Sequence, residues 1–152
     1  MKIFKMLSLA AAVIFAVACN NGKTPDGPSV GGFDNIEQEW KLVSVDGVAN
    51  DFTVYISFES GLFAIYQQVY SWDYVFYEGE YTIDGGVLNG TYFDGSAWKT
   101  PYTGGVSEDG KFLTLKSKDE APVTYVYEAC TIPDNVKEEA TATRALDVVP
   151  FL

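Results

Sequence analysis

The chain has 152 residues, with 10 basic and 21 acidic side chains, no histidine and a formal net charge of −11. This excess of acid excludes nucleic acid as a partner, because phosphate binding needs a clustered cationic surface. It also excludes polybasic attraction to anionic lipid, so attachment to a membrane needs a covalent lipid or an apolar segment.

The first 18 residues have the pattern of a secretory signal peptide. Lys2 and Lys5 precede an apolar run over residues 6–18 that only Ser8 interrupts. A run of this length is too short to span a bilayer core of ~30 Å at ~1.5 Å per helical residue. We therefore expect a signal peptide rather than a permanent anchor.

The end of this run, Ala16-Val17-Ala18-Cys19, resembles the lipobox of bacterial lipoproteins. The resemblance implies cleavage before Cys19, a diacylglyceryl group on its sulfur and an acylated amine. More than one acyl chain makes attachment to a membrane stable. The alternative is an ordinary signal peptide that happens to precede a cysteine.

Residues 19–34 are expected to form a flexible tether, because they are rich in Gly, Pro and Asn and lack periodicity. The resemblance to lipoproteins implies a Gram-negative cell envelope, with the lipid on Cys19 in the outer membrane. The periplasmic face is favoured over the cell surface, because residues 20–23 lack the acidic residues that some such bacteria use as a surface-export signal.

Residues 35–133 carry short runs of β-branched and aromatic residues that end at Gly-containing turns, which predicts strands joined by hairpins. In the run from Phe52 to Phe58, apolar residues alternate with more polar ones, as in a strand with one buried face. We predict an all-β fold, an antiparallel meander of eight strands that closes into a barrel. The eight runs are residues 39–45, 52–59, 62–68, 74–83, 87–93, 101–107, 111–117 and 123–132.

Residues 134–152 are predicted to follow the barrel as a helix and tail. Pro133 suits the start of a short helix over residues 136–140, and the apolar end "DVVPFL" is expected to dock back on the domain. With Cys19 assigned to lipid, Cys130 has no partner for an intrachain disulfide. A nucleophilic cysteine needs a base, so we interpret Cys130 as a buried or half-buried strand residue.

The run from Trp40 to Ile132 resembles the lipocalin-like lipoproteins of gut-type Gram-negative bacteria. The residues that carry the resemblance are "EWKLVSVDG", "YEGEYTIDGGVLNG", "SEDGKFLTL" and "TIPDNV". The resemblance implies a lipocalin-like, calycin-type eight-stranded barrel with a short C-terminal helix or tail. It implies no particular ligand, and Gln38 replaces the glycine of the Gly-x-Trp motif found in lipocalins proper.

Seven aromatic residues lie within residues 66–81. Tyr77 and Tyr81 fall on the apolar face of one strand, so they are predicted to pack inside the barrel, whereas Glu78 and Glu80 fall on the opposite face and should point to water. Two carboxylates at positions i and i+2 of a strand project in parallel, which does not suit the acid pair of a glycosidase.

The candidate ligand-binding residues are Tyr66, Tyr70, Trp72 and Tyr74, with Trp98 on another turn as their partner at one barrel mouth. Aromatic side chains on a rim can stack on a sugar ring or a flat apolar ligand. The alternative is that a bulge shifts the register and these residues complete the core.

These patterns predict a lipid-anchored envelope lipoprotein whose barrel is a non-catalytic binding module for a small apolar or glycan ligand. The alternative is a module that binds an envelope protein, as a complex subunit or a protease inhibitor, with a barrel filled by its own side chains. No cofactor or metal is expected, since there is no phosphate-binding Gly loop and no His or Cys cluster. A hydrolase is the third hypothesis, and it would require a convergent cluster of Asp, Glu, Ser or Lys.

Overall fold

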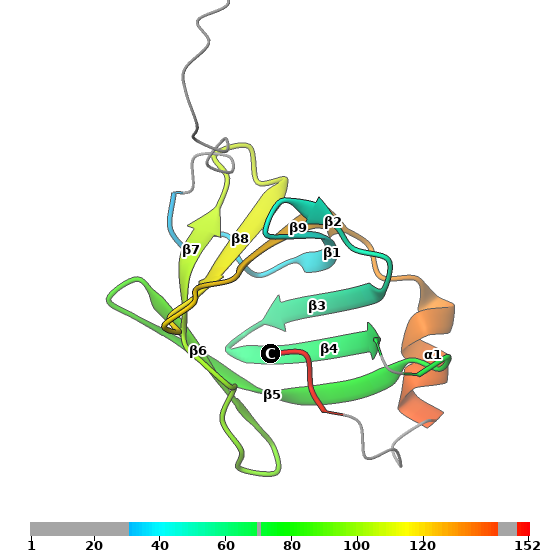
Figure 1. Ribbon diagram of the computed structural model, residues 1–152. Coiled ribbons are helices and arrows are strands. Elements are labelled where there is room, and N and C mark those ends of the chain that lie inside the picture. Colours follow the sequence, from blue (N-terminus) through cyan, green and yellow to red (C-terminus); the bar gives the residue numbers. More distant parts are fainter. Residues whose placement is uncertain (1–30, 70, 143–148) are drawn as a thin grey trace, which may run out of the picture.

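The computed structural model describes residues 31–69, 71–142 and 149–152. The predicted signal peptide, Cys19, most of the tether and Tyr70 therefore lie outside the described residues. Within those residues the chain forms nine strands and one helix (Figure 1). They are β1 (Glu39–Val45), β2 (Val48–Ala49), β3 (Thr53–Glu59), β4 (Leu62–Gln68), β5 (Val75–Asp84), β6 (Val87–Tyr92), β7 (Tyr102–Val106), β8 (Phe112–Ser117), β9 (Thr124–Cys130) and α1 (Asp134–Ala142).

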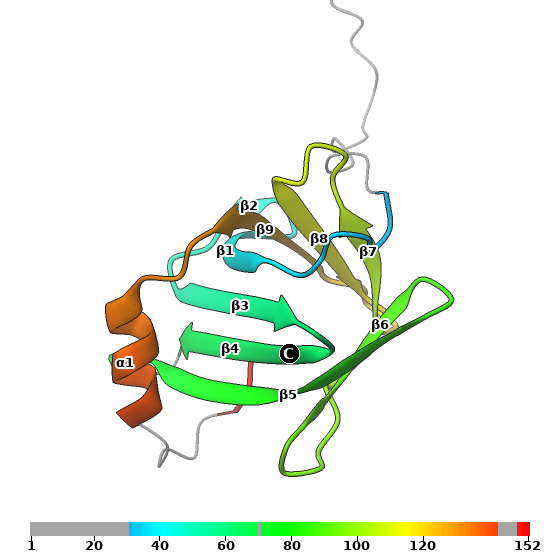
Figure 2. The same ribbon diagram turned by 180° about the vertical axis from the view of Figure 1, so that it is seen from behind.

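The strands form one antiparallel sheet that closes on itself. Their order is β2-β1-β3-β4-β5-β6-β7-β8-β9, and β1 also pairs with β9 (Figures 1 and 2). The two residues of β2 pair only with the end of β1, so the ring itself consists of eight strands. The predicted eight-stranded meander barrel is therefore confirmed. The pairing of β6 with β7 is the least extensive in the ring, with the single residue pair Leu88–Tyr102.

Local sequence explains the hairpins. The turn between β3 and β4 consists of Ser60 and Gly61, which have φ angles of 51° and 81°. Positive φ at both central residues is the type I′ geometry that matches the twist of two paired strands. The same combination recurs at Asp46 and Gly47, between β1 and β2, with φ angles of 49° and 76°.

One continuous core fills the space within the ring. Val54, Ile56 and Phe58 of β3 point into this core, as the alternation predicted. Tyr77 and Tyr81 pack against it as well, which confirms their predicted place. The interior is therefore occupied by the chain's own side chains.

A second, smaller cluster lies on the outer face of the barrel, because α1 covers part of β4 and β5 (Figure 1). Tyr55, Ile132 and Val136 are buried there, and Cys130 is half-buried against them, as predicted for that cysteine. Glu39 ties the helix to the barrel: it accepts hydrogen bonds from the Ile132 amide at 2.7 Å and from Lys137 Nζ at 2.6 Å. No helix within the described ranges is both long and apolar enough to cross a bilayer.

Residues 149–152 return to the barrel and lie beside β4, where the red segment ends in Figure 1. Leu152 is 1% exposed and belongs to the main core. The expectation that the apolar end docks on the domain is therefore confirmed for these four residues.

Candidate ligand site at the barrel mouth

A pocket of about 550 Å³ opens between the start of β3 and the β4–β5 connection. Its lining comes from two short segments at this end of the ring, so their positions follow from the pairing of β3 with β4. The lining residues are Asp51, Phe52, Thr53, Gln68, Val69, Ser71 and Trp72.

Trp72 supplies this pocket with an exposed aromatic ring. Its side chain is 95% exposed, which is unusual for the largest apolar residue and leaves the indole face free to stack. The Gln68 Nε2 donates to the Trp72 carbonyl, and the Asp73 amide donates to Ser71 Oγ at 3.0 Å, so the loop around Trp72 is held by its own polar groups. The pocket thus combines an aromatic platform with polar groups suited to hydroxyl or amide partners.

Of the predicted ligand residues, the structure places Trp72 alone in this pocket among those it describes. Tyr66 and Tyr74 lie on the outer face of the barrel, where they pack against the cluster beneath α1. The Tyr74 ring is 6.3 Å from that of Tyr55, and burial raises the pKa of both Tyr66 and Tyr74. The interpretation of Tyr66 and Tyr74 as rim residues beside Trp72 is wrong, because the helix covers the face they occupy.

The predicted partnership of Trp98 with Trp72 is also wrong. Trp98 is 6% exposed and packs in the core, with its ring 4.9 Å from that of Phe63. The physical reason is the β6–β7 connection, which folds back on β6 so that the Trp98 amide donates to the Gly90 carbonyl at 2.9 Å. Gly90 permits this approach, because a Cβ atom there would lie 2.1 Å from the indole.

A buried polar site that was not predicted lies behind the mouth. Gln67 is 0% exposed and points into the barrel, where its Nε2 donates to the Val149 carbonyl at 3.0 Å. Its Oε1 accepts from the Phe151 amide at 2.7 Å. The signal was present in the sequence: alternation puts Gln67 on the same face of β4 as Phe63 and Ile65, so a polar group occupies a core position.

Phenol groups surround this interior. Tyr92 donates its hydroxyl to the Leu152 carbonyl at 2.7 Å. Burial raises the pKa of Tyr92, Tyr102 and Tyr127, so all three are neutral at physiological pH. The Tyr127 hydroxyl is buried without a hydrogen-bond partner among the described residues. The interior is therefore lined by neutral phenol groups.

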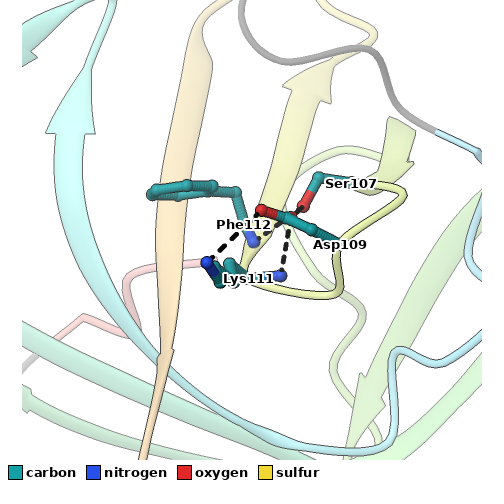
Figure 3. A network of polar contacts seen from close by, with 4 residues as sticks. All are labelled: Ser107, Asp109, Lys111 and Phe112. Atoms are coloured by element: carbon teal, nitrogen blue, oxygen red, sulfur yellow. Dashed lines mark hydrogen bonds and ion pairs between the residues drawn. The ribbon is translucent and has the colours of Figure 1, made fainter.

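The turn between β7 and β8 is a closed polar network (Figure 3). Asp109 Oδ1 accepts from Ser107 Oγ at 2.6 Å and from the Lys111 amide at 3.1 Å, and Ser107 Oγ in turn accepts from the Phe112 amide at 3.0 Å. The Ser107 hydrogen bond is the main reason that the pKa of Asp109 lies below its usual value. This turn organises the hairpin, and within the described residues no group of three or more potential metal ligands comes together.

The closed eight-stranded meander followed by a C-terminal helix is an up-and-down β-barrel, an architecture that lipocalins share. No family model matches the chain, and no curated protein matches it. The chain is similar to the solved structure of an uncharacterized protein from Bacteroides eggerthii, at 15% identity and a TM-score of 0.48, over 62% of this chain and 99% of that one.

Two further solved structures are similar to the chain. A lipocalin-like protein from Bacteroides uniformis aligns at 13% identity and a TM-score of 0.46, over 64% of this chain and 100% of that one. The REP1-NXSQ fatty acid transporter aligns at 11% identity and a TM-score of 0.39, over 65% of this chain and 98% of that one.

Proposed function

We propose that the protein is a non-catalytic binding module that takes a small apolar or sugar-like ligand at the barrel mouth. The observation that carries the proposal is the exposed Trp72 at the edge of a pocket of about 550 Å³. Phe52 and Val69 add apolar surface, while Asp51 and Ser71 add polar groups able to meet ligand hydroxyls. Such a mixture binds a ring that has one apolar face and a polar edge.

We further propose that Cys19 carries lipid and anchors the module to the outer membrane, facing the periplasm. The support is the signal-like run that ends at Cys19, together with the Gly- and Pro-rich residues that follow it. Cys19→Ser should move the protein from the membrane fraction to the soluble fraction after cell lysis. Continued fractionation with membranes would remove lipid attachment from the proposal.

The direct test of ligand binding uses tryptophan fluorescence titrated with fatty acids, bile acids and glycans. Trp40 and Trp98 are buried, so a saturable change should report on Trp72. The Trp72→Ala variant should lose this response without loss of folding, because the side chain contributes almost no burial. Phe93→Ala is the matched control, since Phe93 is another exposed aromatic residue but lines a different hollow.

A response that survives in Trp72→Ala would contradict the mouth site. The same holds if no compound in the panel produces a saturable change in the unaltered protein. In that case the second candidate function, an envelope protein-interaction module such as a complex subunit or protease inhibitor, takes precedence.

The second candidate is favoured by a specific observation, the occupation of the barrel interior by the chain's own residues. Phe151 and Leu152 take up space that a ligand inside a lipocalin-like barrel would need. A photo-crosslinking amino acid at position 72 in living cells tests this candidate. If the protein is an interaction module, the crosslinker should yield one discrete protein adduct. If the protein carries a small molecule, the crosslinker should yield no protein adduct.

A further inference from the structure

Residues 149–152 are held inside the barrel in the manner of a bound peptide. The segment runs inward from the surface, with Val149 55% exposed and Leu152 1% exposed. Three hydrogen bonds hold its backbone: Gln67 Nε2 and the Tyr92 hydroxyl each donate one to it, and its Phe151 amide donates one to Gln67 Oε1.

The Gln67 side chain recognises an extended backbone. Its amide donates to the carbonyl of residue 149 and accepts from the N–H of residue 151, as a neighbouring strand would do. Because Gln67 is fully buried, both groups need partners, and both find them in this segment. An acyl chain or a sugar presents no such donor–acceptor pair at the spacing of a peptide.

The surroundings also select side chains. The Phe151 ring lies 5.8 Å from that of Phe52 and 5.3 Å from that of Tyr125, so it occupies an aromatic slot. Leu152 follows it into the apolar core. The site therefore fits an aromatic residue followed by an aliphatic one.

We propose that the barrel interior around Gln67 and Tyr92 is a peptide-binding site for an extended segment with an aromatic–aliphatic pair. Residues 149–152 are its resident occupant, and a segment of the same pattern on another polypeptide competes with them. Phe52 lies between the two sites, because it lines the pocket at the mouth and its ring lies 5.8 Å from that of Phe151. This site goes beyond the ligand site at Trp72 and shares only Phe52 with it.

The first experiment uses the full chain with Phe151→Ala and Leu152→Ala, which empties both side-chain positions. The probe is the tetrapeptide acetyl-Val-Pro-Phe-Leu, and its binding is measured by isothermal titration calorimetry. We expect one-to-one binding, at least tenfold tighter than to the unaltered chain, where the resident segment competes. Acetyl-Val-Pro-Ala-Ala, the control peptide, should bind at least tenfold more weakly.

Adding Gln67→Leu to this variant should weaken tetrapeptide binding at least tenfold, since it keeps the apolar volume and removes both amide contacts. Adding Trp72→Ala instead should leave peptide binding unchanged, which separates this site from the proposed ligand site. Absence of binding to the folded double variant, or binding that Gln67→Leu does not affect, overturns the proposal.

A second measurement needs no substitution. In the unaltered chain the Phe151 amide is protected by Gln67 Oε1, so excess tetrapeptide should accelerate its hydrogen exchange at least threefold by displacing the segment. The Trp98 amide, bonded to Gly90 within the barrel wall, should exchange at the same rate with and without peptide. If the double variant fails to fold, unchanged exchange at Phe151 in the unaltered chain refutes the proposal.

Discussion

Truncation of Leu152 to alanine distinguishes a docked segment from an integral part of the core. A fully buried leucine in a continuous core usually costs about 2–5 kcal/mol on truncation to alanine, because a cavity remains. Leu152 is 1% exposed, so burial alone predicts that range. Its position at the end of a short docked segment predicts a smaller loss.

The loss of stability is expected to be smaller because the docking of residues 149–152 is itself only weakly favourable. Burial of Leu152 contributes about 2 kcal/mol and partial burial of Phe151 about 1 kcal/mol. Three hydrogen bonds add about 1 kcal/mol each. Ordering four residues, one of them a proline, costs about 4–5 kcal/mol. The docked state is thus favoured by only about 1–2 kcal/mol.

Because undocking limits the loss, Leu152→Ala should lower the free energy of unfolding by no more than about 2 kcal/mol. The assay combines urea denaturation with hydrogen exchange at the Phe151 amide. Exchange at Phe151 should become fast while amides in β3 and β4 stay protected. A loss of about 4 kcal/mol or more, with Phe151 still protected, would refute the reasoning and make the segment a permanent part of the core.

Two other substitutions test the interior. Gly90→Ala should destabilise the barrel by about 3 kcal/mol in urea denaturation, because the new Cβ would lie 2.1 Å from the Trp98 ring. Gly31→Ala is the control for loss of glycine, because its φ is not positive and its Cβ would lie at an ordinary 3.7 Å from the nearest atom; equal effects would contradict the close-packing argument. Tyr127→Phe should leave stability unchanged or raise it by about 1 kcal/mol, because the hydroxyl is buried without a partner among the described residues; a clear loss would mean that this hydroxyl makes a stabilising contact. Burial raises the folded-state pKa of Tyr127 above its unfolded value, so the neutral phenol stabilises the fold below about pH 10, and this contribution is lost as the pH rises further. The thermal denaturation temperature should therefore fall at alkaline pH, and it should fall less in Tyr127→Phe. Equal falls in the two proteins would refute the assignment.

The sequence by itself determined the strands and their order. Alternation of period two in runs such as 52–58 and turn pairs such as Ser60-Gly61 are local features, so they act wherever the rest of the chain lies. The short connections between successive runs then favour pairing of neighbours, which yields the meander. The inward positions of Tyr77 and Tyr81 followed from the same alternation.

Only the tertiary structure decided what the two faces of the barrel contact. Tyr66 and Tyr74 were predicted at the barrel mouth, but they lie on an outer face that packs as a second cluster because α1 lies over it. Trp98 entered the barrel because the β6–β7 connection turns back over Gly90, a contact between a loop and a strand that no periodicity encodes.

The buried site at Gln67 shows the physical reason most clearly. Its partner Phe151 lies 84 positions away in the chain, so their hydrogen bond depends on the fold that brings residues 149–152 back to β4. Local propensity acts over a few residues, whereas burial and hydrogen-bond satisfaction act over whatever distance the fold brings together. The strands of this protein are therefore determined by local alternation and turn residues. Its candidate sites depend on packing between residues that are far apart in the chain.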